Sequence, residues 1–287
     1  MSFVRRVIEI TITLGEGQFG DIPGNQVTLK HHRCQIDIAA NGGLSQGMMQ
    51  ARIYGLPLSM INQLTTIGPI MTQLRSANTI QIDAGNEGET LTTVYIGSIN
   101  TAWGDFQSAP DVALNVMAYS ALDAAIKPYN PTSYSGGVDA AVIMKKLADA
   151  AGYSFEGNNV HVIINNPYYG GTILDQIKSA AQAAGINYDI TNKKLSIWTR
   201  FGYRDGFVPT VSPESGLVGY PVFSSEGIMI QTEFLPSVII GGQITLKGSQ
   251  IPMANGTWNV YQLGHSISAE LPGGPWFSHM AAWNRVS

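Results

Sequence analysis

The sequence of 287 residues has few charged side chains, a single cysteine and no long apolar run. Asp, Glu, Lys and Arg make up 13% of it, against roughly 25% in ordinary soluble domains. One cysteine, Cys34, excludes an intrachain disulfide and fits folding in a reducing cytosol. No apolar run approaches the ~20 residues that span a bilayer. Alternation from Val7 to Thr13 is typical of a strand rather than of a signal peptide. We therefore expect a soluble protein, made without secretion.

The low charge has a consequence for assembly. A surface with few charges does little to keep a free monomer soluble, and the cores of stable interfaces are depleted of charge. We therefore expect neighbouring subunits to cover much of the surface, the alternative being a monomeric β-protein with few charges. The net charge of −4 argues against nucleic-acid binding, which needs clustered Lys and Arg. The nearest cluster, Lys193-Lys194, is typical of a hairpin turn.

Residues 1–135 are predicted to be rich in strands. Glycine is frequent, with 32 residues, and many of these glycines stand at expected turns. Gly85-Asn86-Glu87-Gly88 predicts a hairpin between two strands. Met60, Ile61 and Leu64 lie at helical spacing and predict one short helix over 59–65. The alternation of apolar residues predicts strands over 7–14, 35–38, 79–84, 90–101 and 112–119.

Residues 136–198 have a different pattern, with two amphipathic helices. The helices are expected over Asp139–Ala151 and Thr172–Ala184, with Gly152 and Gly185 as left-handed caps. Thr172 is expected to cap its helix together with Asp175. The segments that start at Ala150 and Ala183 align at an offset of 33 residues. This alignment predicts a helix–cap–hairpin unit that occurs twice.

Residues 199–287 return to short strands, which are predicted over 228–234, 238–240, 243–247, 258–263, 265–270 and 276–283. The fold class is therefore mainly β with an α+β insert. The predicted domains are a first β-domain at 1–135, the insert at 136–198 and a second β-domain at 199–287.

Two patterns raise the question of catalysis or metal binding. Gly43-Leu44-Ser45-Gln46-Gly47 matches the GxSxG nucleophile elbow, which requires a helix directly after the serine. The segment after Ser45 is predicted to be a strand, and a hairpin turn explains the same residues. His32 and Cys34 would project from one face of a strand, but tetrahedral zinc needs two more ligands. The alternative is a pair of half-buried strand residues.

Other side chains suggest ion or sugar binding. Asp83, Asn86, Glu87 and Glu89 surround the predicted hairpin, but their spacing does not match an EF-hand loop. A solvated turn is the alternative to a bound ion there. Aromatic residues in the last 30 positions could stack on sugars or fill a β-domain core: Trp258, Tyr261, Trp276, Phe277 and Trp283. The chain contains neither GxxxxGK[ST] nor GxGxxG, so we assign no catalytic, metal or cofactor residues.

The order of several segments carries a family resemblance. Ile8-Glu9-Ile10-Thr11-Ile12-Thr13-Leu14-Gly15-Glu16-Gly17 opens the chain, and Ile53-Tyr54-Gly55-Leu56 precedes Met60-Ile61-Asn62-Gln63-Leu64. Ala102-Trp103-Gly104-Asp105-Phe106, Ala109-Pro110-Asp111-Val112, Val260-Tyr261-Gln262-Leu263-Gly264-His265 and Gly274-Pro275-Trp276 follow. The whole chain resembles the baseplate hub proteins of phages and prophages. That family is related to contractile-tail hubs, to tail-tube proteins and to the spike-hub part of type VI secretion.

The resemblance implies an architecture and a set of partners. Family hubs are trimers whose chains each carry two tail-tube-like β-barrel domains, here 1–135 and 199–287, so that three chains imitate a six-fold ring. The implied partners are the chain itself, the tail tube protein, the spike protein, the end of the tape-measure protein and other baseplate subunits. The implied location is the virion's tail baseplate, after synthesis in the host cytoplasm. The family role is structural, without a cofactor, and no membrane or specific nucleic acid is among the implied partners.

Two alternatives from other classes remain open. The terminal aromatics favour a β-sandwich protein of the tail that binds a receptor or carbohydrate. The scattered acids and Ser45 are the basis for a peptidoglycan hydrolase. Some family members are longer and carry an extra domain or a fused lysozyme. This length leaves no room for either, so we expect the spike and any hydrolase to be separate chains.

Overall fold

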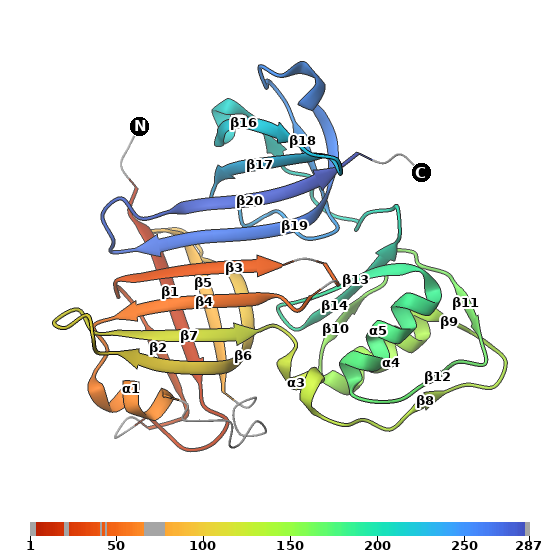
Figure 1. Ribbon diagram of the computed structural model, residues 1–287, viewed down its shortest axis with the longest axis horizontal. Helices are drawn as coiled ribbons and strands as arrows, with labels where there is room; N and C mark the ends of the chain where they lie inside the picture. The colour runs from red at the N-terminus through yellow and green to blue at the C-terminus, as the bar shows by residue number, and fades with distance from the viewer. Residues whose placement is uncertain (1–3, 20–22, 41, 44, 66–77, 285–287) are drawn as a thin grey trace. The chain divides into compact units, whose positions relative to one another are not determined.

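A computed structural model describes residues 4–19, 23–40, 42–43, 45–65 and 78–284 (Figure 1). The chain divides into two compact units. Unit 1 comprises residues 1–38, 48–123 and 265–276, and unit 2 comprises 39–47, 124–264 and 277–287. This division groups residues that pack together and does not test where one domain ends and the next begins. The predicted domain boundaries at 135/136 and 198/199 therefore stay predictions.

Unit 1 is built on antiparallel strands that alternate in burial. In β1, Ile8, Ile10 and Ile12 are buried on one face while the residues between them are partly exposed. This alternation is the sequence signal of a sheet with one face against a core. The hydrogen-bonded order is β3-β4-β7-β6-β5-β1-β2. The bounds are β1 Arg6–Thr13, β2 Gln26–Leu29, β3 Cys34–Ala40, β4 Met48–Tyr54, β5 Thr79–Asn86, β6 Thr92–Asp105 and β7 Ala113–Tyr119.

The sequence predictions for unit 1 are largely confirmed. The predicted short helix lies at Leu58–Leu64 (α1), one residue before its predicted range, and buries Ile61 and Leu64. The predicted hairpin forms between β5 and β6, which pair antiparallel. Both strands are longer than predicted, because β5 continues through Asn86 and β6 through Asp105.

The α+β part of unit 2 contains α4 (Ala140–Ala151) and α5 (Ile173–Ala184). Asp139 caps α4, and Thr172 with Asp175 forms a full capping box on α5. Gly152 and Gly185 end the helices in the left-handed region, with φ of 74° and 62°. The helices and caps are therefore confirmed. The other elements are α3 Leu122–Ile126, β8 Thr132–Ser133, β9 Gly137–Asp139, β10 Ser154–Glu156, β11 Ile163–Asn165, β12 Tyr168–Tyr169, β13 Ile186–Thr191 and β14 Lys194–Thr199.

The predicted repeat is correct in its helices and wrong in one of its hairpins. After α5, β13 and β14 pair antiparallel as a hairpin. After α4, β10 pairs parallel with β14, while β11 pairs with β9. The first unit therefore forms no hairpin, because its two strands find partners elsewhere in the chain. Helix caps depend on neighbouring residues, whereas strand pairing depends on non-local contacts that an alignment of two segments does not contain.

The C-terminal part of unit 2 has its own apolar core. Trp198, Ile228, Ile244, Val260 and Met280 belong to one buried cluster. The strand order is β16-β17-β20-β19, with β18 pairing β19 and β15 pairing β18 in parallel. The bounds are β15 Thr210–Val211, η1 Pro213–Ser215, β16 Leu217–Phe223, β17 Ile228–Glu233, β18 Gln243–Leu246, η2 Pro252–Ala254, β19 Gly256–Ala269 and β20 Trp276–Trp283.

The mainly β class with α+β elements is confirmed, but the barrels need correction. Across the described ranges, no sheet closes on itself. In unit 1 the strand order ends at β2, which pairs only with β1, and in unit 2 it ends at β16, which pairs only with β17. Short strands with glycine turns fit barrels and open sheets equally, because closure depends on the pairing of distant strands.

The helix caps provide a stability test. We expect Gly152→Val or Gly185→Val to destabilise the protein by about 1 kcal/mol or more, because a branched side chain is penalised at positive φ. A Cβ at either glycine meets no atom within 4 Å, so backbone strain is the cause. Thermal melts are the measurement. Gly170→Ala is the matched control, since Gly170 is also uncrowded and is not in the left-handed region. Unchanged melting in both Val variants would contradict the cap assignment.

Candidate interaction surface

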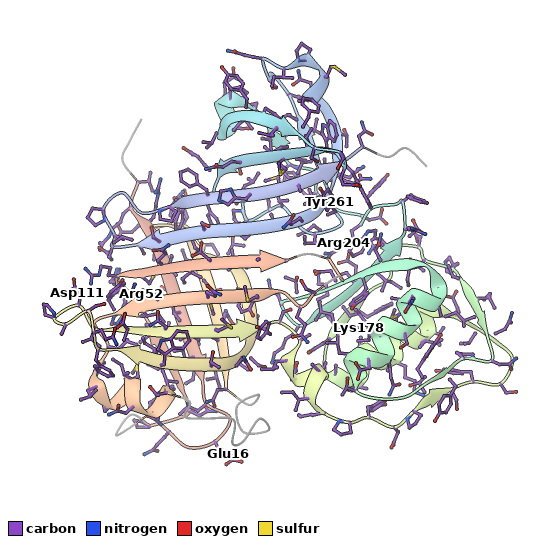
Figure 2. The ribbon with its side chains drawn as sticks, in the orientation of Figure 1. Glu16, Arg52, Asp111, Lys178, Arg204 and Tyr261 are labelled. Atoms are coloured by element: carbon purple, nitrogen blue, oxygen red, sulfur yellow. The ribbon has the colours of Figure 1, made fainter. Side chains whose placement is uncertain are left out.

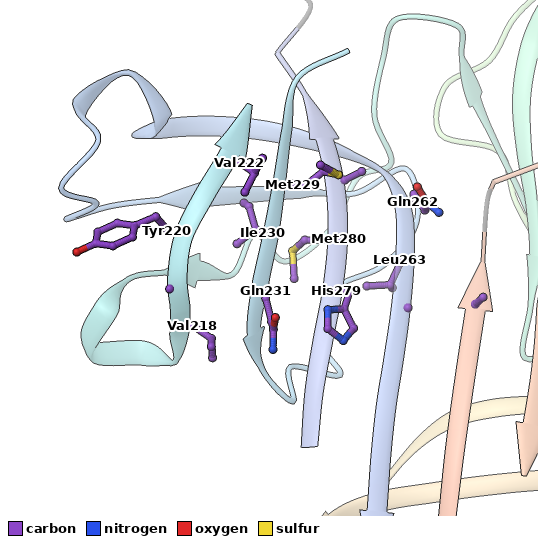
Figure 3. Close-up of a pocket in the computed structure, with 14 residues that line it drawn as sticks. Val218, Tyr220, Val222, Met229, Ile230, Gln231, Gln262, Leu263, His279 and Met280 are labelled. Carbon is purple, nitrogen blue, oxygen red and sulfur yellow. The ribbon is translucent and has the colours of Figure 1, made fainter. Parts of the chain in front are cut away.

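Unit 2 has an open groove over β16, β17, β20 and β19 (Figure 3). Strand register places its side chains in rows. Val222 pairs with Met229, which pairs with Ala281. In a second row, Val218 pairs with Gln231, which pairs with His279. Paired residues lie on the same face of a sheet, so the groove floor is one face of this sheet. We call it the β16–β17 groove.

The β16–β17 groove is apolar and has no formal charge. Its volume is about 550 Å³, within the usual range of ligand pockets. No Asp, Glu, Lys or Arg occurs among its lining residues, which are Ala39, Val218, Gly219, Tyr220, Val222, Met229, Ile230, Gln231, Gln262, Leu263, Gly264, His279, Met280 and Ala281. Tyr220 is 61% exposed, Val222 55% and Met229 47%. Exposed apolar residues that cluster in this way typically mark an interaction site.

Strand β16 ends the sheet order of unit 2, and its outer edge is irregular. The register with β17 shifts between Val218 and Val222, which places a bulge at Gly219, Tyr220 and Pro221. Gly219 has a positive φ of 69°. Pro221 has no N–H to donate to an added strand. A bulge and a proline both discourage pairing at an edge, so this surface is suited to side-chain contacts rather than to strand addition.

A second feature of unit 2 is a short exposed segment between two fixed ends. Arg204 and Pro209 are buried, whereas the four residues between them are exposed. The Arg204 amide donates to the Gly241 carbonyl at 2.7 Å, and the Thr245 amide donates to the Pro209 carbonyl at 2.9 Å. Residues 205–208 therefore form an arch, which we call the Phe207 arch. At its tip Phe207 is 75% exposed.

The side chain of Arg204, which Figure 2 labels, holds one end of this arch. Its Nε and Nη2 donate to the two carboxylate oxygens of Glu156 at 2.8 and 2.9 Å. Its Nη1 donates to the Ile240 carbonyl at 3.0 Å. Bidentate pairs of this kind are strong and geometrically specific. The ion pair therefore connects β10 of the α+β part with the C-terminal strands.

The same pair changes the acidity of Glu156. Hydrogen bonds from Arg204 and Asn158 and the charges of Arg204 and Lys194 outweigh the effect of burial and lower the pKa of Glu156 to about 2. Asp189 behaves in the opposite way, since complete burial raises its pKa above the usual value. Thr191 Oγ1 donates to the Asp189 carboxylate at 2.6 Å.

Unit 1 has a polar pocket of about 430 Å³ around His31, His32, Arg33 and Tyr54. The Arg33 guanidinium lies 4.0 Å from the centre of the Tyr54 ring, and its Nη2 donates to Asp111 Oδ1 at 2.8 Å. Beside it, Arg52 donates to Asp105 Oδ2 at 2.8 Å. Figure 2 labels Arg52 and Asp111. Arginine and tyrosine held in fixed positions are common in the energetic centres of interfaces.

The residues that suggested catalysis or zinc lie in other contexts. Ser45 is exposed, and strand β4 follows it at Met48, in place of the helix that a nucleophile elbow needs. Leu44, the second residue of the motif, lies outside the described residues. Cys34 begins β3 and is buried, and burial raises its thiol pKa to about 11. His32 precedes the strand, so the prediction that both project from one strand is wrong. The His32 Nδ1 atom lies 3.0 Å from the Tyr54 carbonyl oxygen.

The acidic residues of the β5–β6 hairpin do not converge on one point. Asp83 accepts hydrogen bonds from Gln81 Nε2 at 3.0 and 2.9 Å and a third from Thr93 Oγ1. Glu87 pairs with Arg5 at 3.4 Å, and Glu89 accepts from Asn86 at 3.2 Å. Within the described part of the chain, no group of three His, Cys, Asp or Glu is arranged to hold a metal ion.

The terminal aromatics have mixed positions. Trp258 is buried in the core of unit 2, and its Nε1 donates to the Ala254 carbonyl at 2.8 Å. Trp276 is also buried. Tyr261 and Trp283 contact one another with ring centres 5.5 Å apart. Because two of the three tryptophans are buried, the aromatics do not form one exposed platform for a sugar.

Sequence reasoning missed both the β16–β17 groove and the Phe207 arch. The segment Leu217–Phe223 contains five large apolar residues around Gly219 and Pro221, which could have indicated an exposed edge strand. Gly206 before Phe207 and Pro209 after it could have indicated an exposed turn. No local signal identifies Arg204 as buried, because its partner Glu156 is 48 residues away.

The chain matches one model of a known protein family. The family model described as baseplate hub gp41 matches residues 8–270. A search of curated protein sequences finds no match. No helix among the described residues is both long and apolar enough to cross a membrane.

Solved structures share the fold at low sequence identity. The 43 kDa tail protein of prophage MuSo2 from Shewanella oneidensis superposes with a TM-score of 0.60 at 10% identity, and the match covers 96% of each chain. The tail protein from Neisseria meningitidis MC58 gives a TM-score of 0.59 at 9% identity, again over 96% of each chain. A lidless PdpA-VgrG complex gives 0.53 at 10% identity and covers 99% of this chain and 67% of that one.

Proposed function

This chain belongs to the baseplate hub gp41 family, and from that premise we propose that it forms a trimeric ring of pseudo-six-fold symmetry that adapts the tail tube of a phage to its central spike. The family membership carries this proposal. A structural role in the tail follows from the family directly, and its location is the virion's baseplate. The ring, its symmetry and its partners are the proposed part.

Symmetry provides a physical reason for three copies. A tail tube is six-fold and a spike is three-fold, so an adaptor with two similar β-domains per chain presents six similar units from three chains. Head-to-tail contacts of this kind are satisfied when the ring closes. In this proposal residues 1–135 and 199–287 contain β-domains of related topology, which alternate around the ring. The insert at 136–198 lies outside the ring or at its rim.

The proposed partners are the chain itself, the tail tube protein, the spike protein, the end of the tape-measure protein and other baseplate subunits. The low charge of the sequence, 13%, supports extensive coverage by neighbours. Interfaces between copies are expected to bury about 2,000 Å² or more, as permanent contacts do.

An image of the purified oligomer tests the proposal. Electron microscopy at low resolution is expected to find a three-fold ring with a central hole, and light scattering is expected to find three chains. A superposition of 1–135 on 199–287 within a solved assembly then tests the internal similarity. A stable monomer at all concentrations, together with a virion that lacks a ring of this chain, would refute the hub function.

A structural role also predicts the behaviour of Ser45. We expect Ser45→Ala to leave stability within about 0.5 kcal/mol of the parent protein, because the side chain is exposed on a loop. Virion assembly and infectivity are expected to be unchanged. Zymography on cell-wall substrate with the parent and the variant is the measurement. A hydrolytic activity that disappears in a correctly folded Ser45→Ala variant would show that the protein is an enzyme.

A further inference from the structure

We propose that the Phe207 arch of one copy docks in the β16–β17 groove of the next copy, as a head-to-tail contact of the assembly. This inference rests on the proposed ring and names the residues that make one of its contacts. Both surfaces lie in unit 2, and the arch does not line the groove of its own chain.

The arch is built to present an apolar side chain at little entropic cost. Arg204 is fixed by Glu156 and by the Ile240 carbonyl. The Asp205 amide donates to Asn158 Oδ1 at 3.0 Å, which fixes the next residue as well. Ordering a flexible loop on binding costs free energy, and a loop that is already ordered avoids this cost. Phe207 is therefore a pre-positioned contact residue.

The chemistry of the groove fits this occupant. Its lining has no charged side chain, so a charged side chain inserted into it would be desolvated without compensation, whereas Phe207 at the tip of the arch is apolar. One row of its floor, Val222–Met229–Ala281, is apolar, and the exposed Met229 supplies a flexible thioether that favours contact with an aromatic ring. Phe207 lies in an apolar stretch of the same sequence with Phe201 at 46%, Tyr203 at 49% and Val208 at 38% exposure.

Two complementary surfaces on one chain make a head-to-tail contact, which closes as a ring when the rotation allows it. A fully exposed aromatic side chain presents roughly 150–250 Å². At that scale the exposed fractions of Tyr220, Val222 and Met229 amount to on the order of 250–400 Å². This is at most about half of the ~800 Å² that each partner buries in a standard interface. The arch–groove contact is therefore one part of a larger interface.

Cysteine cross-linking of the full chain tests the contact. Phe207→Cys combined with Met229→Cys is expected to give intermolecular disulfides up to a covalent trimer under mild oxidation. The native Cys34 is buried and does not interfere. The matched control is Tyr168→Cys with Met229→Cys, since Tyr168 is 71% exposed in the same unit, close to the 75% of Phe207. The control pair is expected to cross-link several-fold less.

Light scattering completes the test. Phe207→Asp is expected to raise the concentration needed for association about tenfold or more, as loss of a central contact residue does. Phe207→Leu is expected to keep most of the association of the parent protein. Both variants are expected to fold, because the side chain is exposed. If trimers form but the test pair cross-links no more than the control, the arch–groove contact is wrong and the ring stands. If the parent protein is a monomer at all concentrations, the arch–groove contact is wrong, and a virion that also lacks a ring of this chain refutes the hub function itself.

Discussion

Arg204→Met is expected to lower the free energy of unfolding of unit 2 by about 3–5 kcal/mol, the usual cost of breaking a buried ion pair on one side. Methionine approximates the length of the arginine chain but donates no hydrogen bond. Glu156 would lose its bidentate partner, and the Ile240 carbonyl would lose its side-chain donor. Chemical denaturation followed by circular dichroism measures the change.

Two further variants make this prediction specific. Arg200→Met removes an exposed arginine four residues away and is expected to stay within about 0.5 kcal/mol of the parent. The double variant Arg204→Met/Glu156→Leu removes both charges and is expected to recover part of the loss, because a buried pair replaced by apolar residues leaves no unpaired charge. A loss below about 1 kcal/mol in Arg204→Met would mean that the pair does not hold the two parts together.

Acid is expected to destabilise the protein through Glu156, with a loss of roughly 2–3 kcal/mol between pH 4.5 and pH 2. The folded pKa of about 2 lies below the ordinary value of 4.5. The carboxylate therefore stabilises the fold above pH 4.5, and this contribution is lost as the pH falls through 2. The side chain is 27% exposed, so solvent screening lowers the figure only in part.

Denaturation at a series of pH values, with the parent and Glu156→Gln, measures this contribution. The variant is expected to have a flatter pH profile in the acid range. Asp189 acts in the opposite direction, because its raised pKa gives stability that is present at low pH and lost as pH rises through the folded pKa. Asp189→Asn in both backgrounds separates the two carboxyl groups. An identical acid slope in the parent and in Glu156→Gln would exclude Glu156 as its source.

The sequence predicts the local features of this fold well. Gly152 and Gly185 end their helices where the periodic apolar residues stop. Thr172 caps α5 through hydrogen bonds with Asp175, three residues further along the chain. Such signals depend on a few neighbouring residues, so they can be found without the tertiary structure. The β5–β6 hairpin is predictable for the same reason.

Non-local features could not be predicted in this way. The prediction of a hairpin after α4 failed because β10 pairs with β14, about 40 residues away in the chain. The prediction of closed barrels failed because closure requires pairing between the two end strands of a sheet. The β16–β17 groove combines β16, β17, β19 and β20, and only the register of these strands brings its residues to one face. Arg204 had no sequence signal that distinguishes it from an exposed loop arginine.

The bulge and Pro221 in β16 also have a consequence for aggregation. A regular unpaired edge strand is a template for aggregation between copies. The shifted register at Gly219–Pro221 interrupts that template, and Pro221 removes one of its donors. The chain can therefore expose apolar side chains on this face and still resist fibril growth. The protection against edge-to-edge aggregation comes from backbone geometry rather than from surface charge, of which this chain has little.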